Sequence, residues 1–312
     1  MTAIPKRKHP RHDAWFSELS LGNSSWSGLA GREGDKQSEE ILQKAWDAGI
    51  RYFDTAPYYG SGLCERRLGN GLVWQPREEY LLSTKVGITL DPFSRKPGVT
   101  RHYPHHAGFS PICDYSAEGI AASFETSLHR LGIPSADIAY MHGLSICDGG
   151  MDAALETGMP ALLNLREDGR VRMVGVGANT PAIAMAFLKR YDIDLLLFAG
   201  GFSLSDHAGA EAVISLCQER GTGVIAASPF GSGRYFAPEN EPFRQKLQAR
   251  CAEFGISENA AVLQFGLRYP SVLSVLWSTK TLARVELTIQ ASRQPIPDGF
   301  WDALTQDGMI RF

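Results

Sequence analysis

Long uninterrupted apolar runs are missing from this chain of 312 residues. No stretch approaches the ~18 consecutive apolar residues of a membrane-spanning helix, so we expect no membrane span. A large excess of charge is also missing, because 31 basic residues stand against 34 acidic ones for a net charge of −3. This balance disfavours partners recognised by gross charge, and we expect neither nucleic acid nor a membrane surface among them.

Cysteine is scarce, and its pattern excludes two kinds of stabilising site. The five cysteines are Cys64, Cys113, Cys147, Cys217 and Cys251. Their number is odd and none forms a C-x-x-C pair, so we expect neither a disulfide framework nor a zinc site. Such usage is typical of the reducing cytosol and predicts a cytoplasmic protein. The basic segment 6–11 has no apolar run behind it, and we interpret it as a solvated tail rather than a secretory signal.

Segments with the apolar pattern of strands alternate with segments that have the 3.6-residue period of helices. The predicted strands lie near residues 19–21, 52–54, 80–87, 137–142, 171–177, 195–198, 224–227 and 272–277. The predicted helices lie near residues 38–48, 117–130, 161–167, 181–188, 212–219, 259–269 and 282–290. Most strands are continuous apolar runs, which is typical of parallel strands buried on both faces.

Eight β–α units in about 300 residues predict an α/β fold, a closed (β/α)₈ TIM barrel, rather than an open doubly wound sheet. No G-x-G-x-x-G follows the first strand, which further disfavours a dinucleotide-binding open sheet. Because no Pro-, Gly- or Ser-rich linker interrupts the pattern, we expect residues 1–312 to form a single domain. The long irregular stretch 87–115 follows the third strand, and we expect it to cover the mouth of the barrel.

Four polar residues follow or end predicted strands: Asp54, Tyr59, Lys85 and His142. Lys85 lies in an apolar strand, and since an unpaired buried ammonium is costly, it needs a partner that Asp54 can supply. A nearby ammonium is expected to lower the pKa of Tyr59, and His142 can orient or donate to a substrate oxygen. Each residue alone could be a turn, cap or surface residue, but the group together predicts proton transfer to or from a carbonyl or alcohol oxygen.

With these residues in place, the chain resembles the aldo-keto reductase superfamily. The resemblance rests on residues 53–62 (FDTAPYYGSG), 83–85 (STK) and 140–142 (YMH), and it spans nearly the whole chain. It implies a (β/α)₈ barrel, an NAD or NADP cofactor at the C-terminal mouth, and a tetrad of Asp54, Tyr59, Lys85 and His142. Tyr59 is then the general acid in reduction or the general base in oxidation.

Further segments are similar to the aldose 1-dehydrogenase branch, which includes L-fucose, D-threo-aldose and pyridoxal dehydrogenases. They are residues 65–69 (ERRLG), 113–116 (CDYS) and 198–204 (FAGGFSL). The resemblance implies oxidation of a cyclic hemiacetal, an aldose C1 or a pyridoxal-like ring, to a lactone. The chain departs from the family's pattern at three positions. Gly143 replaces a common acidic residue, and Thr288 replaces an asparagine expected near the adenine. Ala227 replaces an aromatic residue that stacks on the nicotinamide, and Phe202 is a candidate for that role.

The resemblance also implies a set of cofactor and substrate residues. Asn179 is expected to hold the nicotinamide carboxamide, although it could be a simple turn residue. Small residues after the seventh strand suit backbone contacts to a pyrophosphate. Cations after the eighth strand face the adenosine end of the cofactor. They meet the 2′-phosphate if the cofactor is NADP, or flank the ribose if it is NAD. These residues are Ser228, Ser232, Gly233, Lys280 and Arg284. Trp26 either lines the substrate pocket or packs at the rim.

The leading hypothesis is therefore an NAD(P)-dependent dehydrogenase of a small-molecule hemiacetal. An NADPH-dependent reductase of aldehydes or ketones is the first alternative, since it uses the same tetrad. A cofactor-sensing subunit with little turnover is a remote alternative, and the intact tetrad argues against it.

Overall fold

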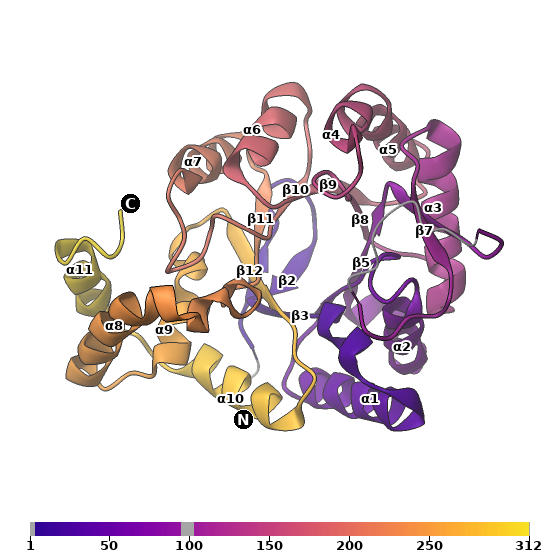
Figure 1. Ribbon diagram of the computed structural model, residues 1–312. Helices are drawn as coiled ribbons and strands as arrows, with labels where there is room; N and C mark the ends of the chain where they lie inside the picture. The colour runs from indigo at the N-terminus through magenta and orange to yellow at the C-terminus, as the bar shows by residue number, and fades with distance from the viewer. Residues whose placement is uncertain (1–3, 95–102, 312) are drawn as a thin grey trace.

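A computed structural model describes residues 4–94 and 103–311. Within them, eight parallel strands close a barrel in the order β10-β11-β12-β3-β4-β5-β8-β9 (Figure 1). The strands are β3 (Leu19–Gly22), β4 (Tyr52–Asp54), β5 (Leu81–Val86), β8 (Ile138–Met141), β9 (Met173–Ala178), β10 (Leu195–Phe198), β11 (Gly223–Ala227) and β12 (Val272–Trp277). The (β/α)₈ barrel that the sequence predicts is confirmed.

Helices surround the barrel and bury their apolar faces against it (Figure 1). They are α1 (Gly31–Asp47), α2 (Leu63–Leu72), α3 (Ala117–Leu131), α4 (Gly150–Ala153), α5 (Met159–Glu167), α6 (Pro181–Arg190), α7 (Ala210–Arg220), α8 (Glu241–Phe254), α9 (Glu258–Gln264), α10 (Leu282–Arg293) and α11 (Asp298–Gln306). The start of α6 illustrates how local sequence sets these bounds. Thr180 accepts a hydrogen bond from the backbone N–H of Ile183, and Pro181 takes the first helical position, where its missing N–H costs nothing.

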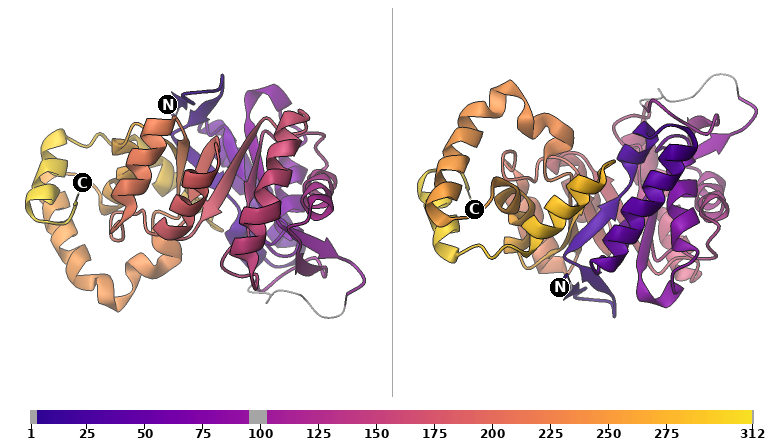
Figure 2. Two further views of the ribbon diagram at one scale, coloured as in Figure 1. Left: turned by 90° about the horizontal axis from the view of Figure 1, so that it is seen from above. Right: turned by 90° about the horizontal axis from the view of Figure 1, so that it is seen from below.

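Two antiparallel hairpins lie at opposite ends of the barrel (Figure 2). The first pairs β1 (Lys6–Lys8) with β2 (Trp15–Ser17). The solvated tail predicted for residues 6–11 is therefore wrong: the Arg7 guanidinium contacts Glu18 and donates to backbone carbonyls near the start of β12, which ties the hairpin to the barrel. No helix in the described part of the chain is long and apolar enough to cross a bilayer.

The second hairpin pairs β6 (Ile88–Asp91) with β7 (Ser110–Cys113) and occupies much of the long stretch after β5. It lies at the end of the barrel where the strands carry their C-termini, as expected for a segment over the mouth (Figure 2). Part of this stretch, residues 95–102, lies outside the described residues.

Candidate active site

The alternation of side chains along the strands decides which residues enter the barrel. Leu81, Ser83 and Lys85 share one side of β5, and Asp54 on β4 pairs in register with Ser83. The Lys85 ammonium donates to Asp54 Oδ2 at 2.5 Å and to the carbonyl of Thr55 at 2.8 Å. Both charged side chains are about 2 % exposed, so the ion pair is shielded from water. Asp54 is therefore the counter-ion of Lys85, as the sequence predicts.

A chain of hydroxyl groups supports this ion pair from inside the barrel. Ser83 donates a hydrogen bond to Asp54 Oδ1 at 2.7 Å, and its hydroxyl also contacts that of Tyr52 at 3.1 Å. The hydroxyls of Tyr52 and Tyr140 lie 3.0 Å apart. Because each oxygen of Asp54 has a donor, the carboxylate is held in one orientation toward Lys85. Sequence reasoning missed these three residues, although Ser83 stands two positions before Lys85.

Tyr59 lies in the tight turn that follows β4. Gly60 adopts φ +60°, and a Cβ there would lie 3.0 Å from the carbonyl oxygen of His105. The backbone of the long stretch can approach this closely because Gly60 has no side chain, and the Ala107 N–H donates to the Gly60 carbonyl at 2.9 Å. The turn that positions Tyr59 therefore also anchors the segment above it.

The ring of Tyr59 faces Lys85, whose ammonium lies 4.9 Å from the ring centroid. Burial, and secondarily the Asp54 carboxylate, raise the pKa of Tyr59 well above its ordinary value. The expected lowering of this pKa by Lys85 is therefore wrong for the protein by itself. The reason is geometric: Lys85 donates to Asp54 and Thr55, and the Tyr59 hydroxyl makes no hydrogen bond with the residues that the structure describes.

His142 follows β8 and packs edge-on against Tyr59, with ring centroids 6.0 Å apart. Its backbone N–H donates to Val86 at 3.0 Å, which places it beside the strand that carries Lys85. Burial, aided by the Lys85 charge, lowers the pKa of His142 to about 3, so the imidazole is neutral at physiological pH. Its Nδ1 atom is buried without a hydrogen-bond partner in the described residues. A neutral ring with one N–H can donate to a substrate oxygen without carrying charge.

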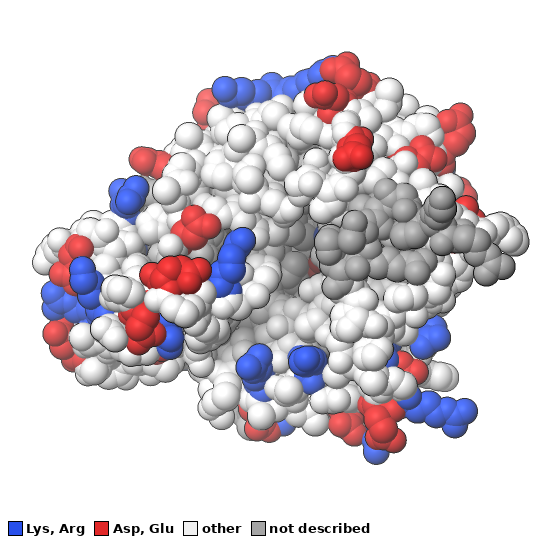
Figure 3. Space-filling view, viewed as in Figure 1, with Lys and Arg blue, Asp and Glu red and all other residues white. Residues whose placement is uncertain are grey.

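Tyrosine rings form a wall beside Tyr59. Tyr103 lies with its centroid 5.4 Å from that of Tyr58 and 5.8 Å from that of Tyr59, in edge-to-face contacts. Tyr58 also lies 6.3 Å from His142. Since Tyr103 belongs to the long stretch after β5, described residues of that stretch border the tetrad. The face that carries the mouth is hollowed near its centre (Figure 3). Sequence reasoning placed the stretch but did not single out Tyr103.

A groove with a volume of about 570 Å³ runs along the opposite side of the mouth. Four of the residues expected to hold the cofactor line it: Ser228, Ser232, Gly233 and Arg284. Ser228 and Ser232 both have φ +56° and Gly233 has φ +97°, so the chain after β11 folds into a tight left-handed loop. Sequence reasoning missed the polar and aromatic residues that complete the groove. They include Ser24, Ser25, Phe236 and Asn259.

Two other cofactor candidates lie outside the groove. The Lys280 side chain points toward Gly28, where a Cβ would lie 3.5 Å from its ammonium nitrogen. Asn179 follows β9, is exposed, and donates its amide to the Ser145 hydroxyl at 3.0 Å. Arg284 is therefore the cation that lines the groove within the described ranges. Whether Lys280 joins Arg284 at one cofactor phosphate stays a prediction.

Trp26 and Phe202 are both buried. Trp26 is fully buried and donates its indole N–H to the Thr279 carbonyl at 3.0 Å, so its role is packing at the rim rather than lining a substrate pocket. Phe202 is 3 % exposed and stacks on Phe198, with centroids 5.7 Å apart. Phe202 also lines a pocket with Ala227 and Ser228, so its role as a stacking residue stays a prediction.

Cys113 and Cys147 form a disulfide, contrary to the expectation from the sequence. The two residues lie 34 positions apart in the chain, but the fold brings β7 against the loop after β8, and their Cα atoms are 6.0 Å apart. Spacing along the chain carries no signal for such a pair, because the contact is made by two separate loops. The other three cysteines are free and buried.

Comparison with known proteins assigns a family. The model of the Aldo/keto reductase family matches residues 18–306. A pyridoxal 4-dehydrogenase from Microbacterium luteolum is 30 % identical, with 99 % of each chain covered. A D-threo-aldose 1-dehydrogenase from Pseudomonas sp. is 32 % identical over 94 % of each chain, and an L-galactose dehydrogenase from Arabidopsis thaliana is 27 % identical over 93 % of this chain and 89 % of its own.

Solved structures agree on the fold. An aldo-keto reductase from Bacillus halodurans in its holo form superposes with a TM-score of 0.78 at 23 % identity, covering 99 % of this chain and 97 % of its own. A glycerol dehydrogenase from Gluconobacter oxydans superposes with a TM-score of 0.76 at 18 % identity, covering 100 % of this chain and 98 % of its own. At these identities, the likeness concerns the barrel.

Proposed function

Since the chain belongs to the aldo/keto reductase family, an oxidoreductase family that uses NAD(P)(H), we propose that it oxidises a cyclic hemiacetal to a lactone. The substrate class is an aldose at C1 or a pyridoxal-like ring, as the names of the two relatives at 30 % and 32 % identity suggest. The observation that carries the proposal is the packing of the Tyr59 ring against a buried Lys85–Asp54 pair and a neutral His142.

Each of these side chains has a defined task in the proposed reaction. The cofactor, when bound, accepts hydride from the hemiacetal carbon. The Tyr59 oxygen takes the proton of the anomeric hydroxyl, and His142 donates an N–H to the same oxygen and fixes its position. The Lys85 charge stabilises negative charge that develops on Tyr59, while Asp54 holds Lys85 in place. The tyrosine wall of Tyr58 and Tyr103 excludes water from this side.

The groove suits a dinucleotide. Its loop after β11 carries Ser228, Ser232 and Gly233, whose small size lets the backbone approach a pyrophosphate closely. We assign Ser228, Ser232 and Gly233 to the phosphates and Arg284 to the adenosine end. Asn179, at the rim near the His142 loop, is assigned to the carboxamide of the nicotinamide.

Arg284 is expected to decide the preference between NAD and NADP. If the cofactor is NADP, Arg284→Ala should raise the KM for NADP by roughly ten-fold or more, because a charge-assisted hydrogen bond contributes about 1.5–3 kcal/mol. The KM for NAD should change little. Lys280→Ala is the matched control, since its ammonium lies outside the groove. Equal effects of both variants on NADP would contradict the assignment of Arg284 alone.

The raised pKa of Tyr59 predicts opposite pH profiles for the two directions. Oxidation needs the deprotonated phenol, so kcat/KM should rise about ten-fold per pH unit from pH 7 to 9. Reduction needs the protonated phenol and should be flat over that range. His142 should add no inflection between pH 5 and 8, because its pKa is lowered to about 3. Steady-state kcat/KM against pH in both directions tests this, and a plateau in oxidation below pH 8 would indicate a different base.

Reduction of an aldehyde or ketone is the second candidate, and the raised pKa of Tyr59 favours it, because a protonated phenol is a ready donor. A panel of aldoses and pyridoxal with NAD⁺ and NADP⁺, and of aldehydes with NADH and NADPH, separates the two by absorbance of the reduced cofactor. The proposal predicts formation of reduced cofactor with a cyclic hemiacetal. Consumption of NADPH by aldehydes, with no hemiacetal oxidised by either cofactor, would overturn it.

A further inference from the structure

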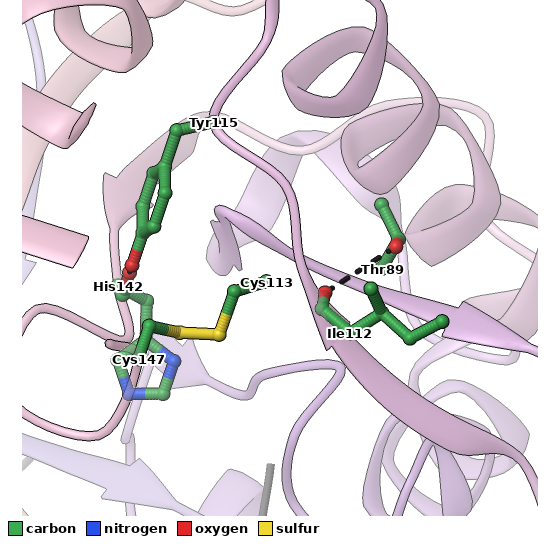
Figure 4. Close-up of a disulfide and its surroundings, with 6 residues drawn as sticks. All are labelled: Thr89, Ile112, Cys113, Tyr115, His142 and Cys147. Atoms are coloured by element: carbon green, nitrogen blue, oxygen red, sulfur yellow. Dashed lines mark hydrogen bonds between the residues drawn. A yellow bond between two sulfur atoms is a disulfide. The ribbon is translucent and has the colours of Figure 1, made fainter. Parts of the chain in front are cut away.

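The disulfide joins two loops on the rim that carries the tetrad (Figure 4). Cys113 ends β7, in the hairpin that follows the Lys85 strand. Cys147 lies in residues 142–150, the His142 turn, which connects β8 to α4. The bond therefore links the segment over the mouth directly to the turn that begins with His142.

A second link runs parallel to the disulfide. Tyr115, two positions after Cys113, donates its hydroxyl to the His142 backbone carbonyl at 2.7 Å (Figure 4). The turn itself closes on Gly143, whose carbonyl accepts from the N–H groups of Ile146 at 3.1 Å and Cys147 at 3.0 Å. His142 is thus held by Tyr115 at its carbonyl and by the disulfide at the far side of a compact turn.

Gly143 shows how tightly these parts fit. It adopts φ +81°, and a Cβ there would lie 2.8 Å from the Tyr115 hydroxyl oxygen and 3.0 Å from Cys147 Sγ. The space that a side chain would need is filled by the tyrosine and the sulfur. Cys147 and Tyr115 are therefore packed closely against the residue next to His142.

We propose that the Cys113–Cys147 disulfide is a redox-sensitive clamp that positions the His142 turn for substrate. Its reductant is a dithiol. The dithiol's thiolate attacks Cys113 Sγ, the S–S bond breaks, and Cys147 leaves as a thiolate that takes up a proton. The second thiol of the reductant then displaces Cys113, closing a cyclic disulfide. Two electrons and two protons pass to the protein. The turn then keeps its hydrogen bonds to Tyr115, Val86 and Asn179 but loses its covalent link to β7.

The other three cysteines are not expected to take part in this thiol–disulfide exchange. Cys64, Cys217 and Cys251 are buried, and burial raises the pKa of the first two to about 12 and of Cys251 to about 11. Cys113 is half-buried and is the more accessible sulfur of the disulfide, since Cys147 is 8 % exposed. A thiol count under denaturing conditions should accordingly change from three to five on reduction.

The clamp and the cofactor groove lie on different sides of the mouth. The groove is built on the loops after β11 and β12, whereas the clamp joins the loops after β5 and β8. Reduction should therefore weaken interactions with the substrate more than cofactor binding in the groove, although Asn179 contacts the turn through Ser145. The substrate readout rests on the proposed function, whereas the mobility of the His142 turn can be measured without any substrate.

The experiment compares the protein oxidised in air with the protein reduced by dithiothreitol. Hydrogen–deuterium exchange of peptides covering residues 141–150 should be faster after reduction. With pyridoxal as the probe substrate, kcat/KM should fall by roughly 3- to 10-fold, less than the ~100-fold that a full 1 Å misplacement can cost. The Kd of NADP⁺, measured by fluorescence titration, should stay within about two-fold because its groove lies apart from the clamp.

Variants test whether the changes in exchange and in kcat/KM come from the Cys113–Cys147 disulfide. Cys113→Ser should show the exchange rate of the reduced protein without dithiol, and Cys251→Ser should retain the full response. Tyr115→Phe should lower kcat/KM more in the reduced protein than in the oxidised one, since the hydroxyl then links β7 and the His142 turn without the disulfide. Five thiols in the air-oxidised protein, or unchanged exchange at residues 141–150 on complete reduction, would overturn the clamp. Inactivity toward pyridoxal with a normal exchange response would count against the proposed substrate and leave the clamp supported.

Discussion

Replacement of Tyr59 by Phe should lower kcat by about 10²–10⁴ in both directions, the usual contribution of a general acid–base group. The ring contacts with His142, Tyr103 and the Lys85 ammonium remain, because they involve the aromatic face and edge rather than the hydroxyl. The hydroxyl makes no hydrogen bond with the described residues, so its removal leaves no buried partner unsatisfied. The melting temperature should therefore stay close to that of the natural protein while turnover is lost.

Tyr191→Phe is the matched control. It removes a tyrosine hydroxyl that donates to the Leu155 carbonyl on the outer helices, far from the mouth. It should cost at most about 1.5 kcal/mol of stability, the net value of one hydrogen bond, and leave kcat unchanged. If Tyr59→Phe retained full turnover with every active substrate, the proton-transfer role of Tyr59 would be wrong.

Lys85→Met should be the most destabilising single change in the site. It leaves the Asp54 carboxylate buried and without its counter-ion, and breaking a buried pair on one side costs about 3–5 kcal/mol. It also removes the charge beside Tyr59, so kcat should fall together with the free energy of unfolding. Urea unfolding and steady-state kinetics measure the two losses separately.

The double variant Asp54→Leu/Lys85→Met separates the two roles of the pair. Apolar residues of similar size should restore much of the stability, since no buried charge remains, but they should not restore turnover. Arg190→Met serves as the control, because its pair with Glu156 is exposed and its loss should leave stability nearly unchanged. Recovery of turnover in the double variant would show that the pair acts only through stability.

The barrel was predictable because its elements carry strong periodic signals. The eight strands are short apolar runs, and helices such as α3 and α6 have clear caps. α8 escaped prediction because it is a polar helix with few buried residues, and it packs on α11 rather than directly on the sheet. The β1–β2 hairpin escaped because its residues are held by contacts to the far end of the chain, which local sequence does not reveal.

The segment that is similar to the aldose dehydrogenase branch has a structural role as well. Glu65 is fully buried and accepts hydrogen bonds from Thr84 and Arg130, and Arg67 contacts the Trp26 carbonyl and Asp35. These contacts join α2 to its neighbours rather than facing the mouth. The similarity at residues 65–69 therefore reflects how this part of the barrel is built.

The sequence by itself determined the barrel, the partnership of Lys85 with Asp54, and the placing of Tyr59 and His142 on one rim. It could do so because strand alternation and the cost of a buried charge act locally or between adjacent strands. Only the tertiary structure decided the raised pKa of Tyr59, the burial of Trp26, the separation of Lys280 from the groove, and the Cys113–Cys147 bond. Each of these depends on distances between loops that are far apart in the chain, and such distances are set by packing of the whole barrel.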